Sequence, residues 1–122
     1  MIAADLARAA ADAADHRGGR DLVLLDVSGI LTICDAFVIA SAPNTRLVAA
    51  IADEVEQQIA ERFEVKPAAV EGLDTRRWVL LDYGDVIVHV FLDEERDYYR
   101  LERLYSDAPR IEWEPPAPTG AQ

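Results

Sequence analysis

Two carboxylates beside a predicted turn are the groups of this chain best spaced for chemistry. Asp82 and Asp85 flank the dipeptide Tyr83-Gly84. Carboxylates this close together could hold Mg²⁺ or act as an acid–base pair. Aspartate is also common at turns, because its side chain hydrogen-bonds the local backbone. We favour the turn interpretation, and a metal-dependent, nucleotidyltransferase-like enzyme using Asp82 and Asp85 is the alternative.

The other reactive side chains stand alone in the sequence. Cys34 is the one cysteine and lies in an apolar run, far along the chain from His16 and His89, which favours burial as a small hydrophobic residue. His89 has no second His or Cys at metal-ligand spacing. The chain also lacks a Gly-rich phosphate loop and a nucleophile elbow. We therefore expect no catalytic residue, metal or cofactor, and no enzymatic activity.

A β-hairpin is predicted to position the paired aspartates. The runs 76–82 and 85–91 are rich in Val, Leu, Ile and aromatic residues, and Tyr83-Gly84 between them is typical of a two-residue turn. This loop places Asp82 opposite Asp85 and Trp78 opposite His89. Alternation along the strands gives a core face of aliphatic residues: Val79, Leu81, Val86, Val88 and Val90.

The opposite face of the hairpin is mixed in character. It carries Trp78 and His89 with Asp82 and Arg76 nearby, a combination of large apolar bodies and polar edges that suits contact with a partner. The alternative is that another helix of the same chain covers this face, as is common in α/β proteins. The sequence pattern leaves both interpretations open.

Helices and further strands surround the hairpin in the predicted fold. Alanine-rich residues 2–16 predict a helix, and residues 21–27, 36–42 and 68–71 predict strands. A long helix follows a cap at Asn44 or Thr45, and its apolar stripe recurs about every four residues: Leu47, Val48, Ile51, Ala52, Val55, Ile59 and Phe63. A closing helix starts at 93–95 with an apolar side of Tyr98, Leu101, Leu104 and Tyr105.

This order of elements predicts an α/β (α+β) fold with a single mixed sheet of four to five strands and flanking helices. At 122 residues the chain is long enough for one domain, which we place at residues 1–108. Residues 109–122 are rich in proline and predict an extended or flexible tail. Docking of Ile111 and Trp113 on the domain is the alternative for that segment.

The charge balance narrows the type of partner. The chain has 23 acidic and 12 basic residues and a formal net charge of −11, so phosphate backbones repel it. An acidic protein is steered toward basic partners, and ribosomal proteins are abundant among these. The longest apolar runs are far too short to span a membrane, and the first ten residues lack an export signal. We therefore expect a cytoplasmic protein with little direct nucleic-acid binding.

Two blocks of sequence resemble the ribosomal silencing factors, the RsfS or Iojap-like family. The first block is residues 25–55, with an Asp before a strand, a small-residue turn and a helix opening. The second follows the family pattern in order and spacing: Glu71-Gly72, Trp78, Asp82-x-Gly84-Asp85, His89, Arg96, Tyr99 and Leu101-Glu102-x-Leu104. The resemblance covers about residues 2–107. Tyr105 departs from it, because the family usually has Trp there.

The resemblance implies a protein that binds the large ribosomal subunit through its fourteenth protein. Joining of the small subunit would be blocked sterically, and translation would fall when nutrients are scarce. It also implies a nucleotidyltransferase-like fold without catalysis, and a homodimer in the free state. Our candidates for partner contact combine an aromatic anchor, acids that pair with Lys or Arg, and amphipathic aromatic residues: Trp78, Asp82, Tyr83, Asp85, His89, Tyr99 and Tyr105.

Overall fold

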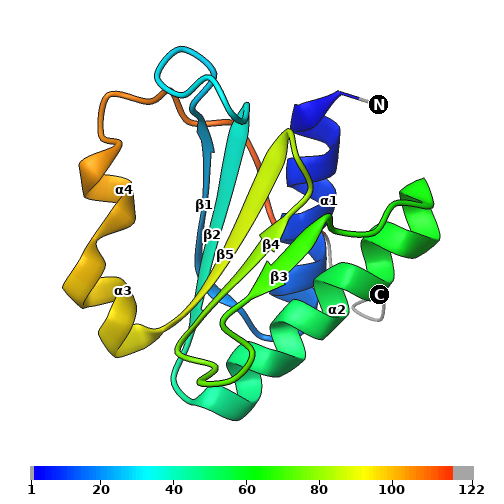
Figure 1. Ribbon diagram of the computed structural model, residues 1–122, viewed down its shortest axis with the longest axis vertical. Coiled ribbons are helices and arrows are strands. Elements are labelled where there is room, and N and C mark those ends of the chain that lie inside the picture. The colour runs from blue at the N-terminus through cyan, green and yellow to red at the C-terminus, as the bar shows by residue number, and fades with distance from the viewer. Residues whose placement is uncertain (1, 117–122) are drawn as a thin grey trace.

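One five-stranded sheet with helices on both faces organises the computed structural model, which describes residues 2–116 (Figure 1). Its elements are, in chain order, α1 (Ala3–His16), β1 (Arg20–Asp26), β2 (Ala36–Ala42), α2 (Thr45–Phe63), β3 (Ala69–Glu71), β4 (Trp78–Asp82), β5 (Val86–Leu92), α3 (Asp93–Tyr99) and α4 (Leu101–Leu104). The strands lie in the order β1-β2-β5-β4-β3. Among the strands of residues 2–116, only β2 and β5 pair in parallel, so the predicted mixed sheet is confirmed.

Helices α1 and α2 cover one face of the sheet side by side (Figure 1). The side chain of Asn44 caps α2 by accepting a hydrogen bond from the Leu47 N–H at 2.8 Å, as predicted. The middle of the predicted apolar stripe is fully buried, whereas Leu47 and Phe63 at its ends are partly exposed. Small alanine side chains on α1 let that helix approach the sheet and α2 closely. Within residues 2–116, no helix is both long and apolar enough to cross a membrane.

The β4–β5 hairpin has the predicted faces but a different register. The five aliphatic residues of its core face are all fully buried. Trp78 pairs with Phe91, Leu80 with His89 and Asp82 with Ile87, so the predicted pairing of Trp78 with His89 is wrong by two residues. The Tyr83 N–H bonds the Val86 carbonyl at 2.9 Å, which makes Gly84-Asp85 the two-residue loop.

The reason for this register lies in the conformation of the turn. Gly84 has a φ of +86°, the conformation that a type II′ turn requires at its first loop residue. Placing the glycine first moves the loop by one position and the pairing by two. Because side chains alternate with period two, a shift of two residues leaves each side chain on its predicted face.

The predicted closing helix is two short helices, α3 and α4. Arg100 between them has a left-handed backbone with a φ of +48°, which breaks the helical repeat. The predicted apolar side is therefore wrong in part: Tyr98 is 80% exposed and Leu104 is 74% exposed. Leu101 and Tyr105 do pack on the sheet, on the face opposite α1 and α2 (Figure 1).

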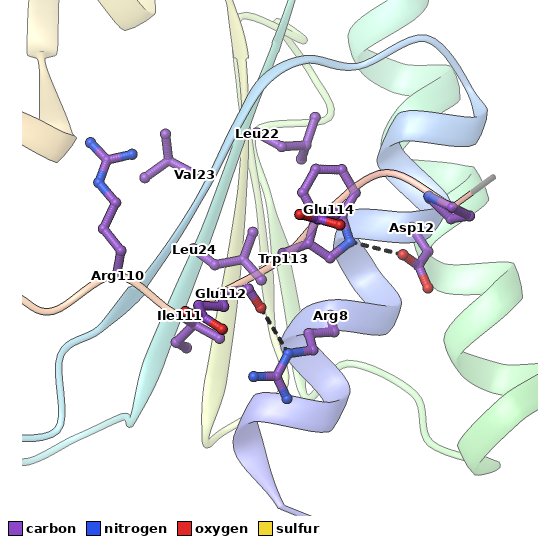
Figure 2. Close-up of a pocket in the computed structure, with 11 residues that line it drawn as sticks. Arg8, Asp12, Leu22, Val23, Leu24, Arg110, Ile111, Glu112, Trp113 and Glu114 are labelled. Atoms are coloured by element: carbon purple, nitrogen blue, oxygen red, sulfur yellow. Dashed lines mark hydrogen bonds between the residues drawn. The ribbon is translucent and has the colours of Figure 1, made fainter.

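The segment after α4 runs along the edge of β1 toward α1. The Ile111 N–H bonds the Leu24 carbonyl at 2.9 Å, and the Trp113 Nε1–H donates to the Asp12 carboxylate at 2.8 Å. Figure 2 shows this bond beside a second one, from Arg8 Nε–H to the backbone carbonyl of Glu112 at 2.9 Å. Ile111 and Trp113 thus dock on the domain, the alternative that the sequence left open. Residues 117–122 of the predicted tail lie outside the described residues.

Candidate functional site

An aromatic cluster lies on the sheet face beneath α3 and α4. Trp78 of β4 stacks on Phe91 of β5 with ring centroids 4.7 Å apart, and Tyr99 at the end of α3 lies 4.9 Å from the Trp78 ring. Tyr99 is 48% exposed and Trp78 is partly buried. The cluster therefore reaches from the core of the sheet to solvent, as an anchor for a partner would.

His89 holds the Trp78 ring in place by a hydrogen bond from the buried side of the cluster. Its Nδ1 accepts a hydrogen bond from the Trp78 Nε1–H at 3.1 Å, which assigns the proton of the neutral imidazole to Nε2. His89 is 4% exposed, and its Nε2 has no hydrogen-bond partner among the described residues. Burial lowers the pKa of His89 to about 4. At neutral pH the ring is uncharged, so His89 supports Trp78 and presents no charge to a partner.

A second aromatic group continues the cluster toward α4. Phe37 of β2 lies edge-on to His89 with centroids 4.7 Å apart, and Tyr105 lies edge-on to Phe37 at 5.1 Å. Edge-to-face pairs of this kind stabilise by about 1 kcal/mol beyond their buried area. The fold therefore connects Tyr105 to Trp78 through Phe37 and His89. Phe37 was missed because β2 is buried on both faces, which leaves no alternation in its sequence.

Tyr83 is separated from these residues. It lies on the face of the sheet that α1 and α2 cover, where it packs against the aliphatic core beneath these helices. Burial raises the pKa of its phenol to about 12, with a smaller contribution from Glu56 of α2, and its hydroxyl has no partner among the described residues. The fold thus gathers Trp78, His89, Tyr99 and Tyr105 on one face and leaves Tyr83 on the other.

Asp82 and Asp85 serve the backbone of the turn. The Asp82 carboxylate accepts a hydrogen bond from the Gly84 N–H at 2.8 Å, as aspartates in turns do. The backbone carbonyl of Asp85 accepts from the Asp35 and Ala36 N–H groups at 2.8 and 3.1 Å, which fixes the turn against β2. In the part of the chain that the structure describes, no three His, Cys, Asp or Glu residues are grouped to hold a metal ion.

Cys34 is buried, as predicted, on the side of the sheet that α3 and α4 cover. It is 4% exposed and belongs to the same cluster of buried hydrophobic residues as Val27, Phe37 and Phe91. Burial raises the pKa of its thiol, and the negative charges of Asp35, Asp82 and Asp85 raise it further. A reactive thiolate needs the opposite environment.

Exposed apolar side chains also lie on α3 and α4, the two helices above the cluster. Tyr98 and Leu104 protrude, and the first turn of α3 is acidic with Asp93, Glu94 and Glu95. Sequence periodicity assigned Tyr98 and Leu104 to the core, because the left-handed residue between the two helices has no signal in the sequence. The site is therefore an aromatic and apolar surface next to the acidic first turn of α3.

Known proteins resemble this chain over nearly its whole length. A family model described as "Ribosomal silencing factor during starvation" matches residues 2–122, beyond residue 107 where the predicted resemblance ended. The ribosomal silencing factor RsfS of Bacillus subtilis is 44% identical over 100 residues, which cover 82% of this chain and 84% of that protein. A crystal structure of a Chromobacterium violaceum protein has a TM-score of 0.83 at 30% identity, covering 98% of this chain and 93% of that one.

A more distant relative comes from the mouse. The protein named mitochondrial assembly of ribosomal large subunit protein 1 is 29% identical over 93 residues, which cover 75% of this chain and 41% of that protein. This chain therefore spans less than half of the mouse protein.

Proposed function

Because this chain belongs to the ribosomal silencing factor family, we propose that it binds the large ribosomal subunit and blocks its association with the small subunit. The contact is with the fourteenth protein of the large subunit, which the family resemblance implies. Translation then falls when nutrients are limiting. The protein acts in the cytoplasm, as a homodimer when it is free, and its effect on the ribosome needs no chemical step.

The observation that carries this proposal is the partly exposed aromatic pair of Trp78 and Tyr99. Interfaces draw most of their affinity from a few aromatic or Arg residues in nearly desolvated pockets, surrounded by contacts that exclude water. Trp78 has this character, because Phe91 and His89 hold its ring from below and Tyr99 borders it at the surface. The rigid sheet beneath the pair limits the entropy that binding would cost.

The charge of the surface supports a basic partner. The first turn of α3, the helix that carries Tyr99, is acidic and its Glu94 side chain is 80% exposed, and the whole chain carries a net charge of −11. Such a field attracts a basic protein surface over a distance and speeds association at low salt. Asp85, in the turn beyond the other end of β4, is exposed and can pair with Lys or Arg. These acids affect the association rate, whereas Trp78 affects the lifetime of the complex.

The mechanism is occlusion of the subunit interface. A folded domain seated on the joining face of the large subunit leaves no room for the small subunit at that place. Repression then depends only on affinity and position.

Co-sedimentation tests the proposal. The purified protein is incubated with isolated large subunits, small subunits or joined ribosomes at several salt concentrations. We expect selective binding to large subunits, and loss of affinity by at least about 30-fold in Trp78→Ala, which corresponds to an anchor worth about 2 kcal/mol. A protein that stays in the supernatant with every subunit and salt concentration would contradict the proposal.

Trp113→Phe is the matched control for this experiment. Trp113 is the other tryptophan of the chain, and it lies against α1 at the far edge of β1 (Figure 2). We expect this variant to bind large subunits like the unaltered protein. Circular dichroism of both variants establishes that each still folds.

A further inference from the structure

Arg96 is the most buried charged side chain on the face that carries the candidate site. It lies in α3, is 9% exposed, and its guanidinium donates to acceptors from three other elements. Two of its nitrogens, Nε and Nη2, bond the Glu102 carboxylate of α4 at 3.0 and 2.6 Å. The remaining bonds reach the Ser41 Oγ of β2 at 3.0 Å and the carbonyls of Arg20 and Asp21 in β1 at 3.3 and 2.6 Å.

Arg96 bonds two places where the backbone is irregular, one in β1 and one between α3 and α4. The pairing of β1 with β2 shifts register between Arg20 and Val23, and Asp21 has a left-handed φ of +51°. The carbonyls that Arg96 bonds lie at this irregularity, so the guanidinium satisfies polar groups where the ladder is disrupted. On its other side Arg96 reaches past the break at Arg100 to bond Glu102.

The break between α3 and α4 decides what this region presents to solvent. With the helix broken at Arg100, Tyr99 lies against Trp78, and Leu104 protrudes. A continuous helix would rotate the residues after Arg100 relative to those before it. Arg96 is bonded to both helices and to the sheet, so it fixes the break and the place of Tyr99 together.

We propose that Arg96 is a positioning residue that holds Tyr99 and α4 in the arrangement that binds the partner. The proposal rests on the proposed function, because it assigns a role to Arg96 in the same surface. Arginine suits this role because its planar guanidinium carries five N–H donors in fixed directions, whereas lysine has one compact ammonium group. Lysine can keep the charge and the bond to Glu102 without reaching the acceptors on β1 and β2 together.

The test separates position from stability by using Trp78 as a probe. The chain contains two tryptophans, so Trp113→Phe leaves Trp78 as the one indole fluorophore. In this background, Arg96→Lys is expected to raise acrylamide quenching of Trp78 about twofold, because Tyr99 no longer holds its place beside the indole. Affinity for large subunits is expected to fall about tenfold, because the surface is no longer preorganised.

Arg77→Lys is the matched control. Arg77 also bonds α3, through Glu95 at 2.6 Å, but its side chain is 49% exposed and the pair can be replaced by a lysine or by water. The same substitution at Arg77 should change neither quenching nor affinity. Glu102→Gln removes the charge that pairs with Arg96 and serves as a second test if Arg96→Lys does not fold.

The outcomes distinguish this proposal from the proposed function. The background protein is the Trp113→Phe variant. If Arg96→Lys or Glu102→Gln folds in this background and keeps its quenching and its affinity, the positioning role is wrong. A lower unfolding midpoint without a change in quenching or affinity would also overturn it, since that is a purely structural role. If quenching rises in both variants but the background protein binds no large subunit, Arg96 positions Tyr99 as proposed and the proposed function is wrong.

Discussion

The two faces of the sheet are closed in different ways, although the same strands form both. Against α1 and α2 the strands present mainly aliphatic and alanine side chains, and two helices of 14 and 19 residues bury most of them. Against α3 and α4 they present Phe37, Trp78, His89 and Phe91, and two short helices of 7 and 4 residues cover them in part. We call the side under α1 and α2 the first face and the side under α3 and α4 the second face. Long amphipathic helices cover the first face, whereas hydrogen bonds and ion pairs attach the short helices to the second face.

The difference indicates where stability and recognition reside. The first face holds the fold, because most of its aliphatic side chains are fully buried. The second face combines a buried aromatic floor with a polar attachment, so its cover can differ in detail without unfolding the sheet. Substitutions on the first face should therefore affect stability, and those on the second should affect binding.

The largest expected effect comes from adjacent residues of β4 that point to opposite faces. Leu81 is fully buried against α1 and α2, whereas Leu80 is partly buried on the other face. We expect Leu81→Ala to lower the free energy of unfolding by about 3.5 kcal/mol, because it removes buried methyl groups and leaves a cavity. Leu80→Ala should cost about 1 kcal/mol, because its site is open to water. Urea unfolding measures both, and equal costs would contradict the contrast between the faces.

On the second face, His89 should make the free energy of unfolding depend on pH in the acid range. The pKa of His89 is about 4 in the folded state against its ordinary 6.5, so the unfolded chain binds more protons between these values. The free energy of unfolding therefore falls as pH drops from 6.5 toward 4, by about 3 kcal/mol at pH 4. Above pH 6.5 both states are neutral at His89 and this contribution is constant.

His89→Phe isolates this contribution. The aromatic ring fits among Phe37 and Phe91 but cannot be protonated. Urea unfolding at pH 7 and pH 4 should show a loss about 3 kcal/mol smaller in the variant, because all carboxylates are common to both proteins. Equal losses in the two proteins would show that His89 is not the buried neutral group described above.

Much of this architecture was predictable because local patterns determine it. The stripe of α2, the cap at Asn44 and the alternation of β4 and β5 each follow from spacing, and the structure confirms them. The break at Arg100 was not predictable, because arginine has no preference for a left-handed backbone and tertiary bonds to Arg96 hold it there. The hairpin register was missed because two placements of one glycine in a two-residue loop give the same faces.

Leu104 provides a smaller and more specific test of the second face. It is 74% exposed, so Leu104→Ser should change the free energy of unfolding by less than about 0.5 kcal/mol. Its affinity for large subunits should fall about fivefold, equal to about 1 kcal/mol, because an apolar contact at the edge of the interface is lost. Ile2→Ser is the control, since Ile2 is 63% exposed at the start of α1, the helix on the other face. A similar loss in both variants would point to non-specific hydrophobic binding.

The site was less predictable than the fold, because sequence order does not show which face a residue near a turn occupies. Tyr83 was grouped with Trp78 and Tyr99 as a contact candidate, since all three are amphipathic aromatic residues in one stretch of the sequence. Strand alternation places Tyr83 with Leu81 on the first face instead, and its hydroxyl is buried beside α2. Sharing one hairpin is therefore a poor guide to sharing one surface.

Tyr83→Phe should have the smallest effect of all. The hydroxyl has no partner among the described residues, so its removal costs no internal hydrogen bond and spares the desolvation of a polar group. We expect the free energy of unfolding to change by less than about 0.5 kcal/mol, toward greater stability, and the affinity for large subunits to stay the same. Urea unfolding and co-sedimentation measure the two quantities on one preparation. A loss of affinity with unchanged stability would place Tyr83 at the partner, and recognition would then extend beyond the second face.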